Sequence, residues 1–534
     1  MECISTGIPY SQTNYFTRIV LDYLDQLPKL KPFFEFPPDI EGIKLAVENR
    51  HKFSTDRAML VRELQNQYKS HSVQQTEVTS KNIDALLSDN TFTVTTAHQP
   101  NIFTGPLYFL YKILHAIKLA EYLTSALPGN KFVPVYYMGS EDADLDELGN
   151  TWIDGQKITW DTNQKGAVGR MVVDKELLGL ISNLERQLSS APDGKELANM
   201  IKESYKKGDS IMLATFRIVN TLFGKYGLLV LIPDNATFKN RMNFIFKDDL
   251  LHQKPSAIVA ETSGKLEKEY KIQAHPRQIN LFYLQDSIRE RIELKDGRYE
   301  VLNTGISFSP EELIVELDIH PENFSPNVIL RGICQEILLP NVAFIGGGGE
   351  LAYWLELKEL FNHYKVPYPV LLLRNSFLIV EKKWQEKLNK LNLGVDDLFL
   401  TEEQLLTKLV TRDTSNAVKL NGAWKKVEQL YESFKQQAGA IDVTLAPHVE
   451  ALKARSLQSL QELEKKMLRA EKRKFTDQQR QIRSIKQKLF PDTSLQERKE
   501  NFSFYYAKWG SSFLDNLYKY SLTLDGKFVI LSEQ

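Results

Sequence analysis

The fold is decided by the stretch Thr93-Val94-Thr95-Thr96-Ala97-His98-Gln99-Pro100-Asn101-Ile102-Phe103-Thr104-Gly105-Pro106, which precedes a largely apolar run to residue 123. A β-rich run, a polar loop and a helix-forming run in this order predict a strand–loop–helix unit. Pro106 suits a first helical turn, because its missing N–H would be unpaired there. The unit recurs around further apolar runs of strand length and helix-forming stretches. The strand runs lie at 132–138, 228–232, 342–345 and 368–373, and the helices at 236–251 and 351–364. This alternation predicts an α/β fold with a parallel sheet covered on both faces.

The composition excludes several classes of protein. The 534 residues are 42% hydrophobic and carry 67 basic and 68 acidic residues, so the net charge of −1 offers no global field for nucleic acid or an anionic membrane. The apolar run at 228–233 is far shorter than the roughly 20 residues of a membrane span. The N-terminal residues lack the basic end and apolar run of a signal peptide, so we expect a cytoplasmic protein.

The two cysteines, Cys3 and Cys334, cannot build a disulfide framework or a Cys-based zinc site. The common enzyme signatures of a Walker A loop, a Gly-x-Ser-x-Gly elbow and a His-Glu-x-x-His helix are also missing. We expect no NAD and no haem.

The chain is predicted to form a core over 1–380, a helical coiled-coil domain over 381–490, and a tail over 491–534 that packs back on the core through a strand at 527–531. Insertions are expected at about 151–215, which is polar and largely helical, and at about 265–330, which contains a hairpin turning at Asp296-Gly297.

The run from 448 to 490 contains no Gly or Pro and carries a coiled-coil seam, with a bend expected at 475–477. The seam residues are Leu460, Leu463, Met467, Ala470, Ile482, Ile485 and Leu489. The seam predicts a homodimer, unless the 421–437 helix of the same chain covers it. The Lys/Arg-rich stretch at 465–488 lies on this helix and is interpreted as a solvated face, so nucleic acid is not an expected partner.

The loop after the first strand offers His98 and Asn101 at the start of a helix. The free N–H groups and positive potential of a helix N-terminus suit a phosphate, and Gly105 would let the backbone approach it. Both side chains could stabilise charge on that phosphate. The alternative is a tight turn in which His98 is a hydrogen-bonded spacer.

The next strand ends in Gly139-Ser140-Glu141-Asp142-Ala143-Asp144-Leu145-Asp146-Glu147, with five carboxylates in seven residues. Carboxyl ends of strands are where open α/β sheets bind ligands. The spacing resembles a calcium loop, but Glu147 replaces the required Gly and Ile153 the required Glu. A magnesium site, an ammonium-binding site and a general base remain, beside the plain alternative of an acidic first helical turn.

A third loop, Gly346-Gly347-Gly348-Gly349-Glu350, lies between a strand and a helix and would let a nucleotide or sugar approach the backbone. Its spacing is not that of an NAD fingerprint, because Leu351 occupies the last position. Glu350 could instead cap the helix. The following strand ends in Arg374-Asn375-Ser376, whose alternative reading is a solvated strand end.

These segments occur in order with further ones over about residues 90–510, and together they resemble the cysteine ligase family of bacillithiol biosynthesis, BshC. The further segments are Val133-Pro134-Val135-Tyr136-Tyr137-Met138, Ser325-Pro326-Asn327-Val328 with Arg331, Gln335 to Pro340, Phe490-Pro491, and Leu495-Gln496-Glu497-Arg498.

The resemblance implies a Rossmann-like core similar to class I aminoacyl-tRNA synthetases, two connective-peptide-like insertions, and a coiled-coil domain that dimerises. It implies ATP-dependent joining of the carboxyl of L-cysteine to the amine of glucosaminyl malate, with ATP or ADP and Mg²⁺ as expected cofactors. His98 to Asn101 would stand where those synthetases carry His-x-Gly-His, with Pro100 and Asn101 altered. Their Lys-Met-Ser-Lys-Ser loop is missing, and Arg374-Asn375-Ser376 would fill part of the gap.

The expected catalytic residues are His98 and Asn101, which would orient phosphates, and Glu141 and Asp142, which would bind the ammonium of cysteine or accept a proton. The expected substrate-binding residues are Ser140, Asp144, Arg331, Gln335, Gly347, Gly348, Glu350, Arg374, Asn375 and Ser376. A second nucleotide pocket is implied near Phe490, Gln496, Arg498, Asn501 and Tyr505. Two alternatives stay open: a nucleotidyltransferase acting on another small molecule, and a nucleotide-binding coiled-coil scaffold without turnover.

Overall fold

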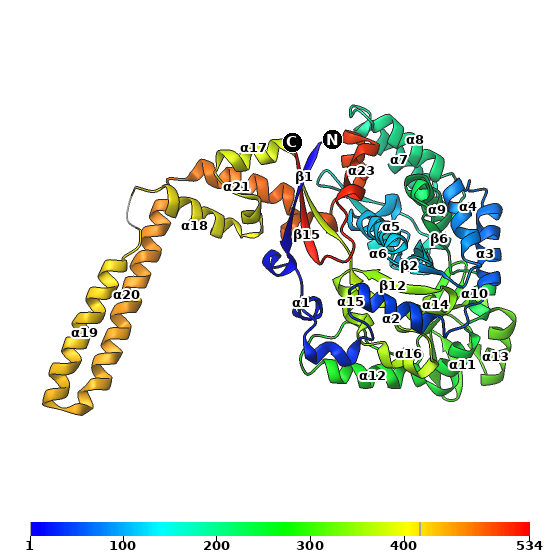
Figure 1. The fold of residues 1–534 in the computed structure, drawn as a ribbon, viewed down its shortest axis with the longest axis horizontal. Coiled ribbons are helices and arrows are strands. Elements are labelled where there is room, and N and C mark those ends of the chain that lie inside the picture. The colour runs from blue at the N-terminus through cyan, green and yellow to red at the C-terminus, as the bar shows by residue number, and fades with distance from the viewer. Residues whose placement is uncertain (1, 416–417) are drawn as a thin grey trace. The chain divides into compact units, whose positions relative to one another are not determined.

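The computed structural model describes residues 2–415 and 418–534. The chain divides into a core unit, Met1–Ile379 with Ser494–Gln534, and a helical unit, Val380–Thr493. Helices and strands of the core are labelled in Figure 1. Within the described ranges, no helix is both long and apolar enough to cross a membrane.

The centre of the core is a five-stranded sheet in the order β13-β12-β2-β3-β6, and every neighbouring pair is parallel. The strands are β2 (Thr91–His98), β3 (Lys131–Met138), β6 (Leu229–Leu231), β12 (Asn341–Gly346) and β13 (Val370–Leu373). All five predicted strand runs lie in this sheet. The α/β prediction is therefore confirmed. Apart from the threonine-rich β2, these buried strands appear in the sequence as continuous apolar runs.

Helix α5 (Tyr108–Ala126) connects β2 to β3 and packs on the sheet together with α2 (Ile40–Arg50). Their apolar side chains share one core with those of the strands. This core includes Ile43, Val47, Phe92, Val94, Ala116, Leu119, Leu123, Val342, Ile345 and Val370. Because the apolar face of α5 packs against the strands, the first turn of α5 is held beside the loop after β2.

The predicted last strand forms, and it belongs to a separate three-stranded sheet and not to the central one. Strand β15 (Lys527–Glu533) lies between β1 (Cys3–Pro9) and β14 (Ser376–Val380). Its pairing with β1 is antiparallel and joins Glu533 to Cys3, so the two ends of the chain lie side by side (Figure 1). A strand at residue 3 had no counterpart among the predicted elements.

The region after β3 contains a hairpin of β4 (Asn150–Ile153) and β5 (Gln156–Thr159), then α7 (Lys175–Leu188), α8 (Gly194–Ser204) and α9 (Ile211–Phe223). The later inserted region is a sheet in the order β10-β9-β8-β7-β11. Its strands are β7 (Leu281–Gln285), β8 (Ile288–Lys295), β9 (Arg298–Val301), β10 (Ser307–Phe308) and β11 (Phe324–Pro326), with α13 (Pro310–Ile319). The predicted turn is confirmed: Asp296 and Gly297 have φ of 48° and 78°, as a two-residue hairpin turn requires.

The remaining helices of the core connect these sheets. They are α1 (Arg18–Leu24), α3 (Arg57–Ser70), α4 (Glu77–Ala85), α6 (Leu145–Leu148), α10 (Ala236–Asn240), α11 (Asn243–His252), α12 (Lys254–Leu266), α14 (Val328–Leu338), α15 (Gly348–Trp354), α16 (Lys358–Tyr364), α22 (Phe502–Trp509) and α23 (Ser511–Tyr520).

The helical unit consists of α17 (Lys382–Lys390), α18 (Glu402–Asp413), α19 (Asn421–Ile441), α20 (Ala446–Lys472) and α21 (Thr476–Leu489). The long predicted run is broken between α20 and α21, where the bend was expected. Helices α19 and α20 form an antiparallel hairpin, joined by Tyr431 to Ser456 at 2.7 Å and Lys435 to Glu450 at 2.8 Å. The seam residues of α21, Ile482, Ile485 and Leu489, are buried, so this part of the seam is used within the chain.

Candidate active site

A cavity of about 500 Å³ opens at the carboxyl ends of the central strands. It is lined by residues of the loops that follow β2, β3, β12 and β13, so all the loops singled out in the sequence contribute to it. The inserted β-sheet, α5, α14, α15 and Arg498 supply the rest of the wall. The lining residues used below are His98, Gln99, Tyr108, Lys112, Asp142, Glu147, Phe282, Arg289, Asn327, Val328, Arg331, Gly347, Gly348, Gly349, Glu350, Tyr353, Arg374 and Arg498. This is where parallel α/β sheets bind ligands.

His98 ends β2 and lies in the cavity wall. Its side chain packs against the rings of Tyr108 and Phe109, with centroids 5.2 and 5.3 Å away. The residue is 9% exposed, and its Nε2 has no hydrogen-bond partner among the described residues. Burial, followed by Lys112 and Arg374, lowers the pKa of His98 well below its usual value. At neutral pH the cavity therefore contains an uncharged imidazole with an unused nitrogen.

Asn101 lies in the same loop but does not line the cavity. It begins a short turn in which Phe103 and Thr104 have positive φ values of 52° and 71°. A Cβ on Gly105 would lie 2.8 Å from the Cβ of Asn101, so this glycine makes room for a neighbouring side chain instead of a ligand. Asn501 donates to the carbonyl of Phe103 at 2.8 Å and stabilises the turn.

Asp142 follows β3 and faces the cavity. Both of its oxygens accept from Arg331, at 3.0 and 3.1 Å, and Arg289 lies 3.5 Å from one of them. Burial would raise the pKa of Asp142, but Arg331, followed by Arg289 and Gln99, outweighs burial and lowers it to about 2. Asp142 is therefore a permanently charged acceptor at physiological pH and a poor proton acceptor.

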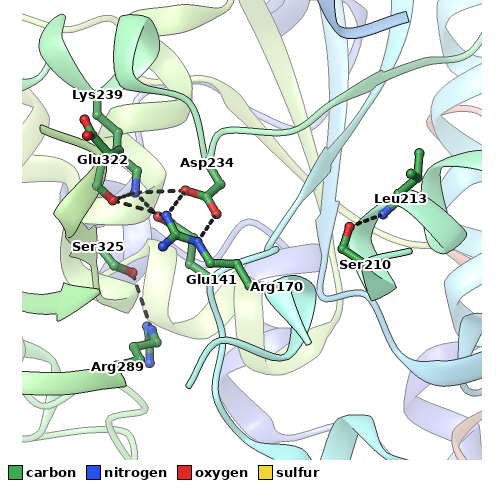
Figure 2. Close-up of polar contacts among 9 residues, drawn as sticks. All are labelled: Glu141, Arg170, Ser210, Leu213, Asp234, Lys239, Arg289, Glu322 and Ser325. Carbon is green, nitrogen blue, oxygen red and sulfur yellow. Dashed lines mark hydrogen bonds and ion pairs between the residues drawn. The ribbon is translucent and has the colours of Figure 1, made fainter. Parts of the chain in front are cut away.

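Glu141, the preceding residue, does not line the cavity and belongs to a buried ion network (Figure 2). Glu141 forms an ion pair with Lys239, which also contacts Asp234 at 3.3 Å and the carbonyl of Glu322 at 3.0 Å. Arg170 binds both oxygens of Asp234 at 2.7 and 2.8 Å. The network connects the loop after β3 with three other segments of the chain.

Backbone hydrogen bonds from a neighbouring turn also hold the loop after β3. The turn Val168–Arg170 donates from the Val168 N–H to the Asp142 carbonyl at 2.7 Å and from the Gly169 N–H to the Ser140 carbonyl at 3.1 Å. A Cβ on Gly169 would lie 2.2 Å from the Ser140 carbonyl oxygen, so only glycine fits there. The Ser140 side chain is buried outside the cavity. Asp144 is exposed and caps α6, as in the alternative of an acidic first turn.

The glycine loop after β12 forms another wall of the cavity. Gly347, Gly348 and Gly349 have no positive φ, so the backbone conformation does not require glycine. A Cβ on Gly349 would meet nothing within 4 Å, and one on Gly348 would meet only Val20 at 3.3 Å. The missing side chains therefore leave space in the cavity and serve neither a turn nor a tight packing contact.

Glu350 closes this loop and contributes an ion pair. Its carboxylate accepts from the Gly347 N–H at 2.7 Å and pairs with Lys112 at 2.5 Å. Lys112 lies on α5 with only 1% of its side chain exposed. Burial lowers the pKa of Lys112, and Glu350 opposes that effect. The pair places a buried ammonium group at the cavity wall.

Of the segment after β13, only Arg374 lines the cavity. Its guanidinium pairs with Glu497 at 2.7 Å and lies 5.0 Å from the centre of the Tyr108 ring. Asn375 donates to the Leu522 carbonyl at 3.0 Å, and Ser376 accepts from Arg374 at 3.1 Å. Gln335, on α14, donates to Glu336 at 2.9 Å. These last three side chains are buried in hydrogen bonds away from the cavity.

The residues expected around a second nucleotide pocket occupy several environments. Gln496 bonds both backbone groups of Ile379 at 2.9 and 3.1 Å, Asn501 holds the turn after β2, and Tyr505 stacks with Trp509 and Phe513. Phe490 belongs to the helical unit, where its ring packs 5.5 Å from that of Phe399. Arg498 lines the main cavity instead. A second pocket stays a prediction.

Several cavity residues were not among the site residues expected from the sequence: Tyr108, Lys112, Glu147, Phe282, Arg289, Asn327 and Tyr353. Lys112 could have been predicted as a site residue, because it is the one charged residue in the apolar run 107–117. Nothing in the sequence distinguishes Arg289, since arginines are common on exposed hairpins. Partial burial, Asp144 and Asp142 raise the pKa of Glu147, which lies beside Asp142 at the cavity.

A dedicated metal cage does not fit the donor set of this cavity. Asp142 and Glu350 are already engaged by Arg331 and Lys112. Over residues 2–415 and 418–534, no group of three or more His, Cys, Asp or Glu side chains is arranged to hold an ion. Mg²⁺ that arrives on nucleotide phosphates needs few protein ligands, so the expected ion would be carried by the nucleotide.

Comparison with known proteins matches both parts of the chain to domain models of one family. The family model "Bacillithiol biosynthesis BshC, N-terminal Rossmann-like domain" matches residues 2–375, and "Bacillithiol biosynthesis BshC, C-terminal coiled-coil domain" matches residues 377–533. A relative from Flavobacterium psychrophilum is 40% identical over 97% of this chain and 96% of its own length. Relatives from Flavobacterium johnsoniae and Cytophaga hutchinsonii are 37% and 36% identical, covering 99% and 93% of both chains. All three are named "Putative cysteine ligase BshC".

Proposed function

We propose a specific reaction for this chain, which belongs to the BshC family of bacillithiol biosynthesis. It is the ATP-dependent ligase that joins the carboxyl of L-cysteine to the amine of glucosaminyl malate. The names of its relatives support the cysteine ligation. One observation carries the proposal: the unused nitrogen of neutral His98 lines the same cavity as three glycines and the cations Lys112 and Arg374.

The chemistry requires two activations. A carboxylate does not react with an amine until one of its oxygens becomes part of a leaving group, which ATP supplies by phosphoryl or adenylyl transfer. Lys112, Arg374 and Arg498 would offset the charge of the phosphates, and the glycine loop would give them room. His98, uncharged at neutral pH, would donate a hydrogen bond to an oxygen that gains charge.

The amine must also lose a proton before it attacks. Asp142 stays ionised because Arg331 binds it, so it suits binding of the cysteine ammonium better than base catalysis. Glu147 has a raised pKa and lies in the same wall, which makes it the better proton acceptor of the two. Glu141 would not contact the substrate; it would position the loop after β3 through its ion pair with Lys239.

A substrate panel tests the proposal. Purified protein is incubated with glucosaminyl malate, L-cysteine and ATP, and mass spectrometry follows the thiol product and the nucleotide released. Product is expected only when all three are present. Nucleotide turnover that is independent of cysteine would favour a nucleotidyltransferase, and tight nucleotide binding without turnover would favour a scaffold; either result contradicts the ligase.

Assembly and location complete the proposal. Side chains on the α19–α20 hairpin remain exposed, among them Leu430 at 49% and Leu463 at 47%, and we place a homodimer contact there. We also place the reaction in the cytoplasm, where the two cysteines, Cys3 and Cys334, would stay reduced.

A further inference from the structure

Arg289, on the inserted hairpin strand β8, is a cation in the cavity that the proposed chemistry has not used. Its side chain is 8% exposed, and its guanidinium lies over the ring of Phe282 at 3.9 Å. Stacking on the ring fixes the plane of the guanidinium. Its five N–H donors are costly to bury without acceptors.

The acceptors present are distant. The Arg289 Nε lies 3.4 Å from the Ser325 Oγ (Figure 2), and its Nη2 lies 3.5 Å from an Asp142 oxygen. Charge-assisted hydrogen bonds are about 2.7–2.9 Å long, so neither contact is a strong one. Asp142 is shared, because both of its oxygens bind Arg331 at 3.0 and 3.1 Å. One carboxylate thus faces two guanidinium groups.

The first turn of α14 adds positive potential to the same wall. Asn327 and Val328, at the start of this 11-residue helix, both line the cavity. The Asn327 side chain is already occupied, since it accepts from the Ile329 N–H at 2.8 Å and donates to Asn280 at 3.0 Å. A helix N-terminus attracts anions, and beside an under-neutralised arginine it favours a bound carboxylate.

We propose that Arg289 and the first turn of α14 form a subsite for a carboxylate group of a substrate. The planar fork of a guanidinium matches the two oxygens of a carboxylate. The subsite deepens the proposed function, on which it depends for its two candidate sources: the malyl group of the acceptor and the carboxylate of cysteine. The wall built by the inserted hairpin would then select the substrate.

Calorimetric titration of the full-length protein tests the subsite without turnover. The probes are L-malate, L-cysteine and ATP, and the variants are Arg289→Gln and Arg289→Lys. Arg291→Gln is the matched control, because Arg291 lies on the same strand, is exposed and does not line the cavity. A charge-assisted pair contributes enough for Arg289→Gln to weaken one carboxylate probe by about 10- to 100-fold. Arg289→Lys should recover only part of the loss.

The outcomes distinguish the two sources of the carboxylate, and they separate a failure of the subsite from a failure of the ligase function. Weaker L-malate binding assigns the subsite to the malyl group, and weaker L-cysteine binding assigns it to cysteine, with ATP unchanged in both cases. The inference is overturned if well-folded Arg289→Gln binds every probe as the wild type does, if only ATP is affected, or if wild-type protein binds neither carboxylate at millimolar concentration. Arg289-dependent binding without thiol product would overturn the ligase alone.

Discussion

Substitution of Lys239 by methionine should lower the free energy of unfolding by more than the loss of an exposed ion pair does. Lys239 is 1% exposed and faces two carboxylates, Glu141 at 6% and Asp234 at 3%. Methionine keeps the apolar stem but leaves Glu141 buried without its cation, whereas Asp234 retains Arg170. Breaking a buried ion pair from one side costs about 3–5 kcal/mol.

Urea unfolding at neutral pH, followed by circular dichroism, measures this loss. Lys247→Met is the matched control, because Lys247 pairs with Asp318 in an exposed contact whose loss costs about 0–1 kcal/mol. The charge argument also requires a rescue. Glu141→Gln added to Lys239→Met removes the uncompensated carboxylate. The loss of unfolding free energy in the double variant should therefore be smaller, by about 1–3 kcal/mol, than the sum of the losses in the two single variants.

The reasoning is refuted if the two single effects simply add. It is also refuted if Lys239→Met unfolds at the same urea concentration as Lys247→Met. Because the network holds the loop that carries Asp142, the folded fraction of Lys239→Met should have a raised KM for cysteine, and Lys247→Met should not.

Three further predictions concern the site and the assembly. His98→Ala should lower thiol formation by about 100-fold or more while the protein still unfolds cooperatively, and the wild-type pH–rate profile should show no inflection near pH 6.5, since the pKa of His98 is well below that value; an inflection there that the variant loses would contradict the assignment. Gly349→Val should fold normally, because a Cβ added there would meet no described atom within 4 Å beyond its own helix and chain neighbours, yet ATP titration should show binding weakened by tenfold or more, and normal affinity would remove the loop from the site. Deleting the α19–α20 hairpin should convert a dimer to a monomer in light scattering, and a surviving dimer would move the interface elsewhere.

The central sheet could be predicted from the sequence because its determinants are local. Buried parallel strands such as β3 and β12 are continuous apolar runs, and the loops after them carry their own glycines and charges. The pairing of β15 with β1 could not be predicted in the same way. It joins residues more than five hundred positions apart, and nothing in either strand specifies the other.

The site was predictable as a set of loops and much less as a set of side chains. Glu141 and Asp142 are adjacent in sequence, yet one enters a buried network and the other lines the cavity. Which one faces the cavity depends on Lys239 and Arg331, cations supplied by distant segments. Asn375 illustrates the same limit, since its neighbour Arg374 lines the cavity while its own side chain binds a backbone carbonyl.

The central claim is that ATP activates the carboxylate of cysteine for attack by an amine. It is tested most directly by a single turnover with L-cysteine labelled with ¹⁸O in its carboxyl group. Activation through either an adenylate or an acyl phosphate leaves one labelled oxygen on the phosphorus product, so mass spectrometry should find ¹⁸O in AMP or in inorganic phosphate. The amide should be formed in equal amount. Product formed with no label in either phosphorus compound, or labelled nucleotide without amide, would contradict the account.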